Sequence, residues 1–198
     1  MPLPYRLALF VHIAALLAAI AASTLIHFFQ HRVATAERAP EARRWIALIQ
    51  RTSVAFPIAL LLLVATGGYM VGQAWTWSVG WVDAGLVGVA FLFVNGIRFG
   101  KQGRATLDAL ERAGDVPLGG AGAARGRRMA RATYANTGVA TAVVFVMSLK
   151  PGIAGSLAAL VVGAIAGLMV GARTTRVASV AAASEDGSLD QGLETEPA

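Results

Sequence analysis

The sequence contains no cysteine and few charged residues. Without cysteine there can be no disulfide bond, thiolate zinc site or cysteine-held iron–sulfur cluster, and the redox compartment cannot be read from the chain. Only 14% of the 198 residues are charged, whereas soluble domains carry about 25%. Because 56% are hydrophobic, a single water-soluble core of this size is an implausible place to bury them. Lipid is therefore the expected solvent.

The hydrophobic residues form five long runs. A helix needs roughly 20 apolar residues to cross a bilayer, and the runs cover about 5–28, 53–73, 81–99, 133–149 and 153–172. The fourth run is the shortest and carries Asn136, Thr137 and Thr141, so it spans only if those groups face other helices. Residues 1–177 are thus predicted to form an all-α polytopic membrane bundle of five transmembrane helices, with four as the alternative.

The first run could also be read as a cleavable signal peptide over residues 1–22, because "AAIAAS" resembles a small-residue cleavage site. We favour a membrane span, since the apolar run continues through "TLIHFF" and only one positive charge precedes it.

Almost all basic residues fall on one side of the predicted membrane. If the five runs alternate in direction, one side holds the basic loops 29–52 and 98–132 together with the segment after the last run, and the other side holds only Arg6 and Lys150 of the 17 Lys and Arg. The positive-inside rule then predicts a bacterial cytoplasmic membrane protein with its N-terminus outside and its C-terminus in the cytoplasm. Membrane topology therefore explains the net charge of +6, and nucleic-acid binding is not needed to account for it.

The loop 29–52 contains a predicted amphipathic helix. Pro40 suits the first turn of a helix, and Trp45, Leu48 and Ile49 then fall on one face. We expect this helix to lie at the membrane interface and to run into the second span, with Pro57 bending the junction.

Two further segments have low-complexity composition. "DVPLGGAGAARG" precedes the fourth span without the strand that a phosphate-binding loop requires, so it is predicted to be a flexible linker. Residues 178–198 are acidic and have little to bury, which predicts a disordered tail.

His12 is the most informative polar residue, because it lies inside the first apolar run. At 1.5 Å per residue it falls about 6 Å outward of the midplane, and Met70, Asp83 and Met147 fall about 8–10 Å outward on other spans. Imidazole with thioethers suits copper as Cu(I), or haem b with His and Met as axial ligands. His12 and Asp83 could instead form a proton-linked pair. The plain alternative is that His12 bonds a backbone carbonyl or Tyr69 while the methionines fill gaps.

Two other patterns carry weaker predictions. His27 and His31 have a metal-chelating spacing of four residues but no third ligand nearby, so interfacial polar residues are the commoner explanation. Small residues recur every fourth position in the fifth run, which predicts a packing seam with a helix of this chain or of a second subunit; they are Gly155, Ala159, Gly163, Gly167 and Gly171.

Residues 5–100 resemble a bacterial group of small polytopic membrane proteins. The features that carry this resemblance are "LFVHIAALLAA", "RTSVAFPIALLLLVATGGYMVG" and "WTWSVGWVDAG". The group includes uncharacterised predicted integral membrane proteins and is similar to the membrane domain of copper-resistance protein D and to small haem-linked protoporphyrinogen oxidases. The resemblance implies a helical membrane fold and a metal or haem role for His12 alone, since the later spans contain no histidine.

Three functions follow as expectations. The leading one is a small non-enzymatic membrane scaffold or subunit that contacts the lipid bilayer and assembles as a homo-oligomer or membrane complex. The second is a copper- or haem-handling redox protein centred on His12 with Met70 or Met147. The third is a proton-coupled transporter that uses His12 and Asp83, although the short spans show no pair of broken helices.

Overall fold

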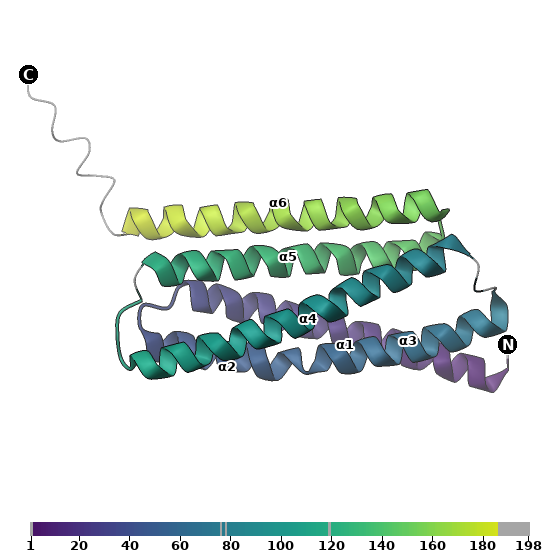
Figure 1. Ribbon diagram of the computed structural model, residues 1–198, viewed down its shortest axis with the longest axis horizontal. Coiled ribbons are helices and arrows are strands. Elements are labelled where there is room, and N and C mark those ends of the chain that lie inside the picture. The colour runs from purple at the N-terminus through teal and green to yellow at the C-terminus, as the bar shows by residue number, and fades with distance from the viewer. Residues whose placement is uncertain (1, 76, 78, 119, 186–198) are drawn as a thin grey trace, which may run out of the picture.

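The computed structural model describes residues 2–75, 77, 79–118 and 120–185. These residues form α1 (Leu3–Ala34), α2 (Ala39–Ser53), α3 (Ala55–Ala74), α4 (Gly80–Ala113), α5 (Gly120–Leu149) and α6 (Ile153–Glu185). Figure 1 shows these helices running along one common direction, with α6 on the outside of the bundle beside α5. The fold class is all-α, as predicted.

Five helical segments of the described chain are long and apolar enough to cross a membrane: Leu3–Ala34, Ala39–Ala74, Gly80–Ala113, Gly126–Leu149 and Ile153–Thr174. They confirm five spans, including the short fourth one. Large apolar side chains cover the outside of the bundle, and Leu61 and Val162 expose 65% and 64% of their surface. Water would not tolerate so continuous an apolar surface, so the chain is a multi-pass membrane protein.

The two ends of the bundle differ in chemistry. At one end lie the start of α1, the α3–α4 link with Trp75 and Trp77, and the α5–α6 turn at Lys150; we call this the indole end. At the other end lie the α1–α2 and α4–α5 links and the end of α6. We call it the basic end, because the arginine-rich segments 29–52 and 98–132 extend there.

The basic segments are largely helical rather than loops. α4 continues to Ala113, and α5 begins at Gly120, inside the segment predicted to be a flexible linker. α6 likewise continues to Glu185, into the predicted disordered tail, whereas residues 186–198 lie outside the described residues. The difference has a physical reason, because alanine and arginine are strong helix formers that extend a helix once a span has nucleated it.

The amphipathic helix runs into the second span, as predicted. α2 is separated from α3 only by Val54, and the two run end to end as one helical segment of 36 residues (Figure 1). The break comes one turn before Pro57, whose ring removes a helical hydrogen bond. The apolar face of α2 packs against α1 and α4, and its buried residues are Ala39, Ala42, Ile46 and Ile49. Leu48 is exposed, and Trp45 stacks on Phe29 at 6.0 Å between ring centroids.

The small residues of α6 form the tightest helix contact. A Cβ built on Gly163 would lie 2.8 Å from the Cβ of Ala142, and one on Gly167 would collide with the Tyr134 carbonyl oxygen. A Cβ built on Gly171 would lie 2.9 Å from the Cα of Arg131. The predicted seam is therefore intramolecular, between α5 and α6, and a contact with a second subunit has to use another surface.

Two contacts close the ends of the bundle. At the indole end, Lys150 Nζ lies 4.6 Å from the ring centroid of Trp75 and 5.7 Å from that of Trp81. At the basic end, the Arg38 guanidinium makes two bonds of 2.8 Å to the two oxygens of Asp115. Backbone bonds from Ala39 to Val116 and from Leu118 to Glu37 join the same two links.

Candidate functional site

Among the described residues, polar side chains of different helices meet inside the bundle at three places, and His12 marks the first. It lies on α1 and is half-buried, with Nδ1 2.9 Å from the hydroxyl of Thr66 on α3. The Thr66 hydroxyl donates its proton to the Leu62 carbonyl of its own helix, so it can only accept from His12. The imidazole ring also packs against Gly67, where an added Cβ would lie 3.3 Å from Cε1. His12 is thus an interhelical hydrogen-bond donor.

Among the described residues His12 bonds Thr66, and its predicted partners Asp83, Met70 and Tyr69 lie as follows. Asp83 is exposed on α4, and no ion pair between described residues links it to His12. Met70 is half-buried one turn beyond Thr66 on α3, and Tyr69 is exposed.

Met147 belongs to a different environment. Its side chain lies against Gly85 of α4, next to an apolar cluster that contains Val71, Trp81 and Val146. Figure 1 shows α1 and α5 diverging toward the indole end. A gap-filling role explains the position of Met147, because its unbranched thioether side chain occupies the space that Gly85 leaves open.

His27 and His31 face different surroundings. His27 is half-buried against α5, with its ring tilted by 32° against that of Tyr134 at 4.3 Å between ring centroids, whereas His31 is exposed. Within the described residues no group of three or more His, Asp or Glu side chains is arranged to hold a metal ion.

His27 belongs to the second polar place, which we call the α1–α5 seam; it consists of Ser23, His27, Gln30, Thr133, Tyr134 and Thr137. His27 Nε2 lies 2.9 Å from the Thr137 hydroxyl, which also lies 3.4 Å from the Ser23 hydroxyl. One turn away, the Gln30 amide donates to the Thr133 hydroxyl at 2.7 Å. His27 Nδ1 and Gln30 Oε1 are buried and have no hydrogen-bond partner among the described residues.

Sequence reasoning foresaw only part of this seam. It required Asn136, Thr137 and Thr141 to face other helices. Thr137 faces His27, and Asn136 accepts a bond of 3.0 Å from Asn95 on α4. Thr141 does not, because it is exposed and bonds the Thr137 carbonyl of its own helix. Sequence reasoning missed Gln30 and Thr133. The signal was available, since polar residues recur at helical spacing on α1 and α5 at equal depth beside the arginine-rich segments.

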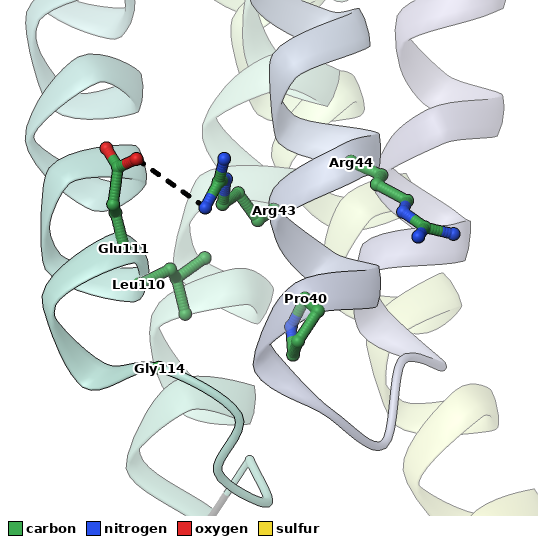
Figure 2. Close-up of a pocket in the computed structure, with 6 residues that line it drawn as sticks. All are labelled: Pro40, Arg43, Arg44, Leu110, Glu111 and Gly114. Atoms are coloured by element: carbon green, nitrogen blue, oxygen red, sulfur yellow. Dashed lines mark ion pairs between the residues drawn. The ribbon is translucent and has the colours of Figure 1, made fainter.

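A shallow groove of about 280 Å³ lies at the basic end, between α2 and the end of α4. Figure 2 shows Arg43 reaching toward Glu111, with 3.6 Å between their charged atoms, while Arg44 points away. Nearby, the hydrogen bond from Arg38 lowers the pKa of the exposed Asp115 carboxyl. The groove lies beyond the apolar runs 53–73 and 81–99, and the Glu111 carboxylate beside it is paired with Arg43.

Comparison with protein-family models, with curated proteins and with solved structures gives no match. The resemblance to the copper-resistance and protoporphyrinogen oxidase group therefore remains a prediction.

Proposed function

We propose that the protein is a non-enzymatic scaffold or subunit of the bacterial cytoplasmic membrane, with its N-terminus outside and its C-terminus in the cytoplasm. One observation carries the proposal: the polar side chains within the spans bond to one another across helices. His12 bonds Thr66, His27 bonds Thr137, Gln30 bonds Thr133 and Asn95 bonds Asn136.

This pairing gives each group a structural use. In lipid, helices associate through close packing and interhelical hydrogen bonds, because the apolar side chains are no better solvated by protein than by lipid. The four bonds link α1 to α3, α1 to α5 and α4 to α5. Helix association therefore accounts for His12 without copper or haem, and the side chain of Met147 lies against Gly85 of α4.

A scaffold needs a surface for its partner. The outer faces of α3 and α6 are apolar and exposed, and they include Leu61, Val162 and Ile165. Because the small-residue face of α6 is already covered by α5, these outer faces are where a partner helix or a second copy can dock.

The test is crosslinking in native membranes. A photoreactive amino acid at Leu61 or Val162 should give a discrete crosslinked band, while the same group at the fully buried Val146 should crosslink only within the chain. Absence of a band from both outer faces would remove the scaffold proposal. An absorption spectrum of the purified protein tests the rival function: a Soret band that disappears in His12→Ala would replace the scaffold with a haem protein.

The orientation can be tested separately, because the natural chain has no cysteine. Gln73 is exposed near the indole end and Asp108 near the basic end. A membrane-impermeant maleimide added to intact cells should label Gln73→Cys and spare Asp108→Cys until the cells are opened. The reverse pattern would overturn the assigned topology.

A further inference from the structure

Aromatic side chains cover the contact between α1 and α2 at the basic end. The ring of Trp45 on α2 lies 6.4 Å from that of Phe28 and 6.0 Å from that of Phe29, centroid to centroid, and both phenylalanines belong to α1. Phe28 nevertheless exposes 54% of its surface. In membrane proteins, exposed aromatic rings near the end of a span lie at the boundary between lipid and water. Phe28 therefore faces lipid on the outside of the bundle.

The same aromatic side chains hold a cation. Arg32 lies one turn beyond Phe28 on α1, and its guanidinium carbon lies over the Trp45 ring, 5.2 Å from the centroid. Arg32 is exposed, and among the described residues it makes no ion pair. A guanidinium carries several N–H donors, and a contact with one ring leaves most of them available. The charge is thus held in place without an anionic partner from the described chain.

A second cation lies beside the first. Arg44 precedes Trp45 on α2 and is exposed, and Figure 2 shows it pointing away from Glu111, the carboxylate that pairs with Arg43. No described acidic residue forms an ion pair with Arg44. Leu48 follows Trp45 by three positions and Arg44 by four, so it shares their side of the helix. Leu48 is exposed as well.

The apolar and cationic side chains are arranged in the order of a phospholipid. α1 runs toward the basic end, and along it the exposed Leu25 and Phe28 come before Arg32. α2 runs back from that end, and on it Arg44 comes before Leu48. On both helices the apolar residues are on the membrane side of the cation. An acyl chain that lies on them places its phosphate at the guanidinium groups, which bind phosphate strongly and with two donors at once.

We propose that this surface binds an anionic phospholipid from the leaflet at the basic end. We call it the headgroup patch; it consists of Leu25, Phe28, Arg32, Arg44, Trp45 and Leu48. The two guanidinium groups bind the phosphate, and the exposed apolar side chains contact the acyl chains. An anionic lipid is preferred over a zwitterionic one, because the cation of a zwitterionic headgroup is repelled by the arginines. The patch does not depend on the scaffold function or on its partner.

Trp45 can report on the bound lipid. The chain has four tryptophans, and the other three belong to the indole end; they are Trp75, Trp77 and Trp81. The emission of Trp45 is therefore the part that Trp45→Phe removes. The full chain is reconstituted in phosphocholine liposomes that contain a minor fraction of lipid brominated in its acyl chains, because bromine quenches a tryptophan that it touches.

The comparison is between two brominated lipids that differ only in the headgroup. We expect the phosphoglycerol lipid to quench Trp45 several-fold more than the phosphocholine lipid does. Equal quenching by the two lipids would overturn the proposal. Inorganic phosphate added at millimolar concentration should leave the quenching unchanged, since it has no acyl chain to contact the apolar side chains. Loss of the quenching on addition of phosphate would show a site for the free ion and would overturn the lipid as its ligand.

Variants of single arginines separate the patch from the general positive charge of this end. Arg32→Gln and Arg44→Gln should each reduce the preference for the anionic lipid several-fold, and Arg44→Gln does so while it leaves the contact between Arg32 and Trp45 intact. Arg43→Gln is the matched control: it removes the same charge from α2, but Arg43 pairs with Glu111 on α4, and the preference should remain. An unchanged preference in either folded patch variant, or an equal loss in Arg43→Gln, would overturn the site.

Discussion

His12 Nδ1 lies 2.9 Å from the hydroxyl of Thr66, across the contact between α1 and α3. The partner is a hydroxyl that is itself anchored to its own helix, so the bond fixes how the two helices are rotated against each other. A polar group buried in lipid without a partner is costly. The bond gives both the imidazole and the hydroxyl a partner and so avoids that cost.

Thr66→Val should therefore destabilise the bundle, because it keeps the shape of the side chain and removes the hydroxyl. Interhelical hydrogen bonds in membranes contribute roughly 0.6–1.7 kcal/mol, and we expect a loss of this size in the free energy of unfolding measured in mixed micelles. Thr141→Val is the control, since Thr141 is exposed and bonds only the Thr137 carbonyl of its own helix. Equal effects of the two substitutions would show that the His12 bond has no special role.

The glycine seam between α5 and α6 makes a second prediction. In Gly167→Ala the new methyl group meets the Tyr134 carbonyl and the Cα of Ala135, so α6 has to move away from α5. Overpacking of this kind costs about 1–3 kcal/mol, and a lower thermal midpoint should report it.

Gly96→Ala is the matched control, because it adds the same methyl group where there is open space. Gly96 lies within α4, and nothing is within 4 Å of an added Cβ. Alanine is favoured over glycine by about 0.5–1 kcal/mol inside a helix, so this variant should be as stable as the natural protein or more stable. A stabilising Gly167→Ala would mean that α6 does not pack on α5 as described.

Lys150 makes a third prediction at the indole end. Its ammonium group lies over Trp75 and Trp81, which are themselves packed edge to face at 5.5 Å. An exposed cation–π contact contributes about 0.5–1 kcal/mol, so Lys150→Met should lower stability by that amount and change the tryptophan emission. Lys150→Arg retains a cation and should change neither quantity. Identical emission from the Met and Arg variants would argue against the contact.

The spans were predictable because their signal is local. Runs of apolar residues long enough to cross a bilayer are read directly from the chain, and the turn at Lys150-Pro151-Gly152 separates α5 from α6 as proline requires. The extensions of α5 and α6 beyond their apolar runs were missed, because an apolar run marks the span and not the alanine- and arginine-rich turns that continue the helix.

Pairing of the polar residues could not be derived in the same way. Depth along each span places His12 level with Met70, Asp83 and Met147, but depth says nothing about which helices are neighbours or how each is rotated. In the structure, His12 meets Thr66 while Met147 meets Gly85 on another helix. Rotation is set by close packing at glycines such as Gly67 and Gly163, which is a property of helix pairs rather than of one span.

The link between Arg38 and Asp115 makes a final prediction, on pH. The hydrogen bond from Arg38 lowers the pKa of Asp115 in the folded protein. Its contribution to stability is therefore complete above the ordinary aspartate pKa of about 4 and is lost as the pH falls through the lower folded value. Because both side chains are exposed, the effect is local rather than global.

Hydrogen exchange at the two backbone bonds beside this pair can measure the loss. The Ala39 and Leu118 amides donate to Val116 and Glu37 at 3.0 and 2.9 Å, and Asp115→Asn should speed their exchange at neutral pH. The difference between the variant and the natural protein should vanish in acid, where Asp115 is protonated in both. Glu111→Gln is the matched control, because it breaks the neighbouring ion pair with Arg43 without touching these bonds. A difference that persists in acid would show that the carboxylate charge does not hold the two links together.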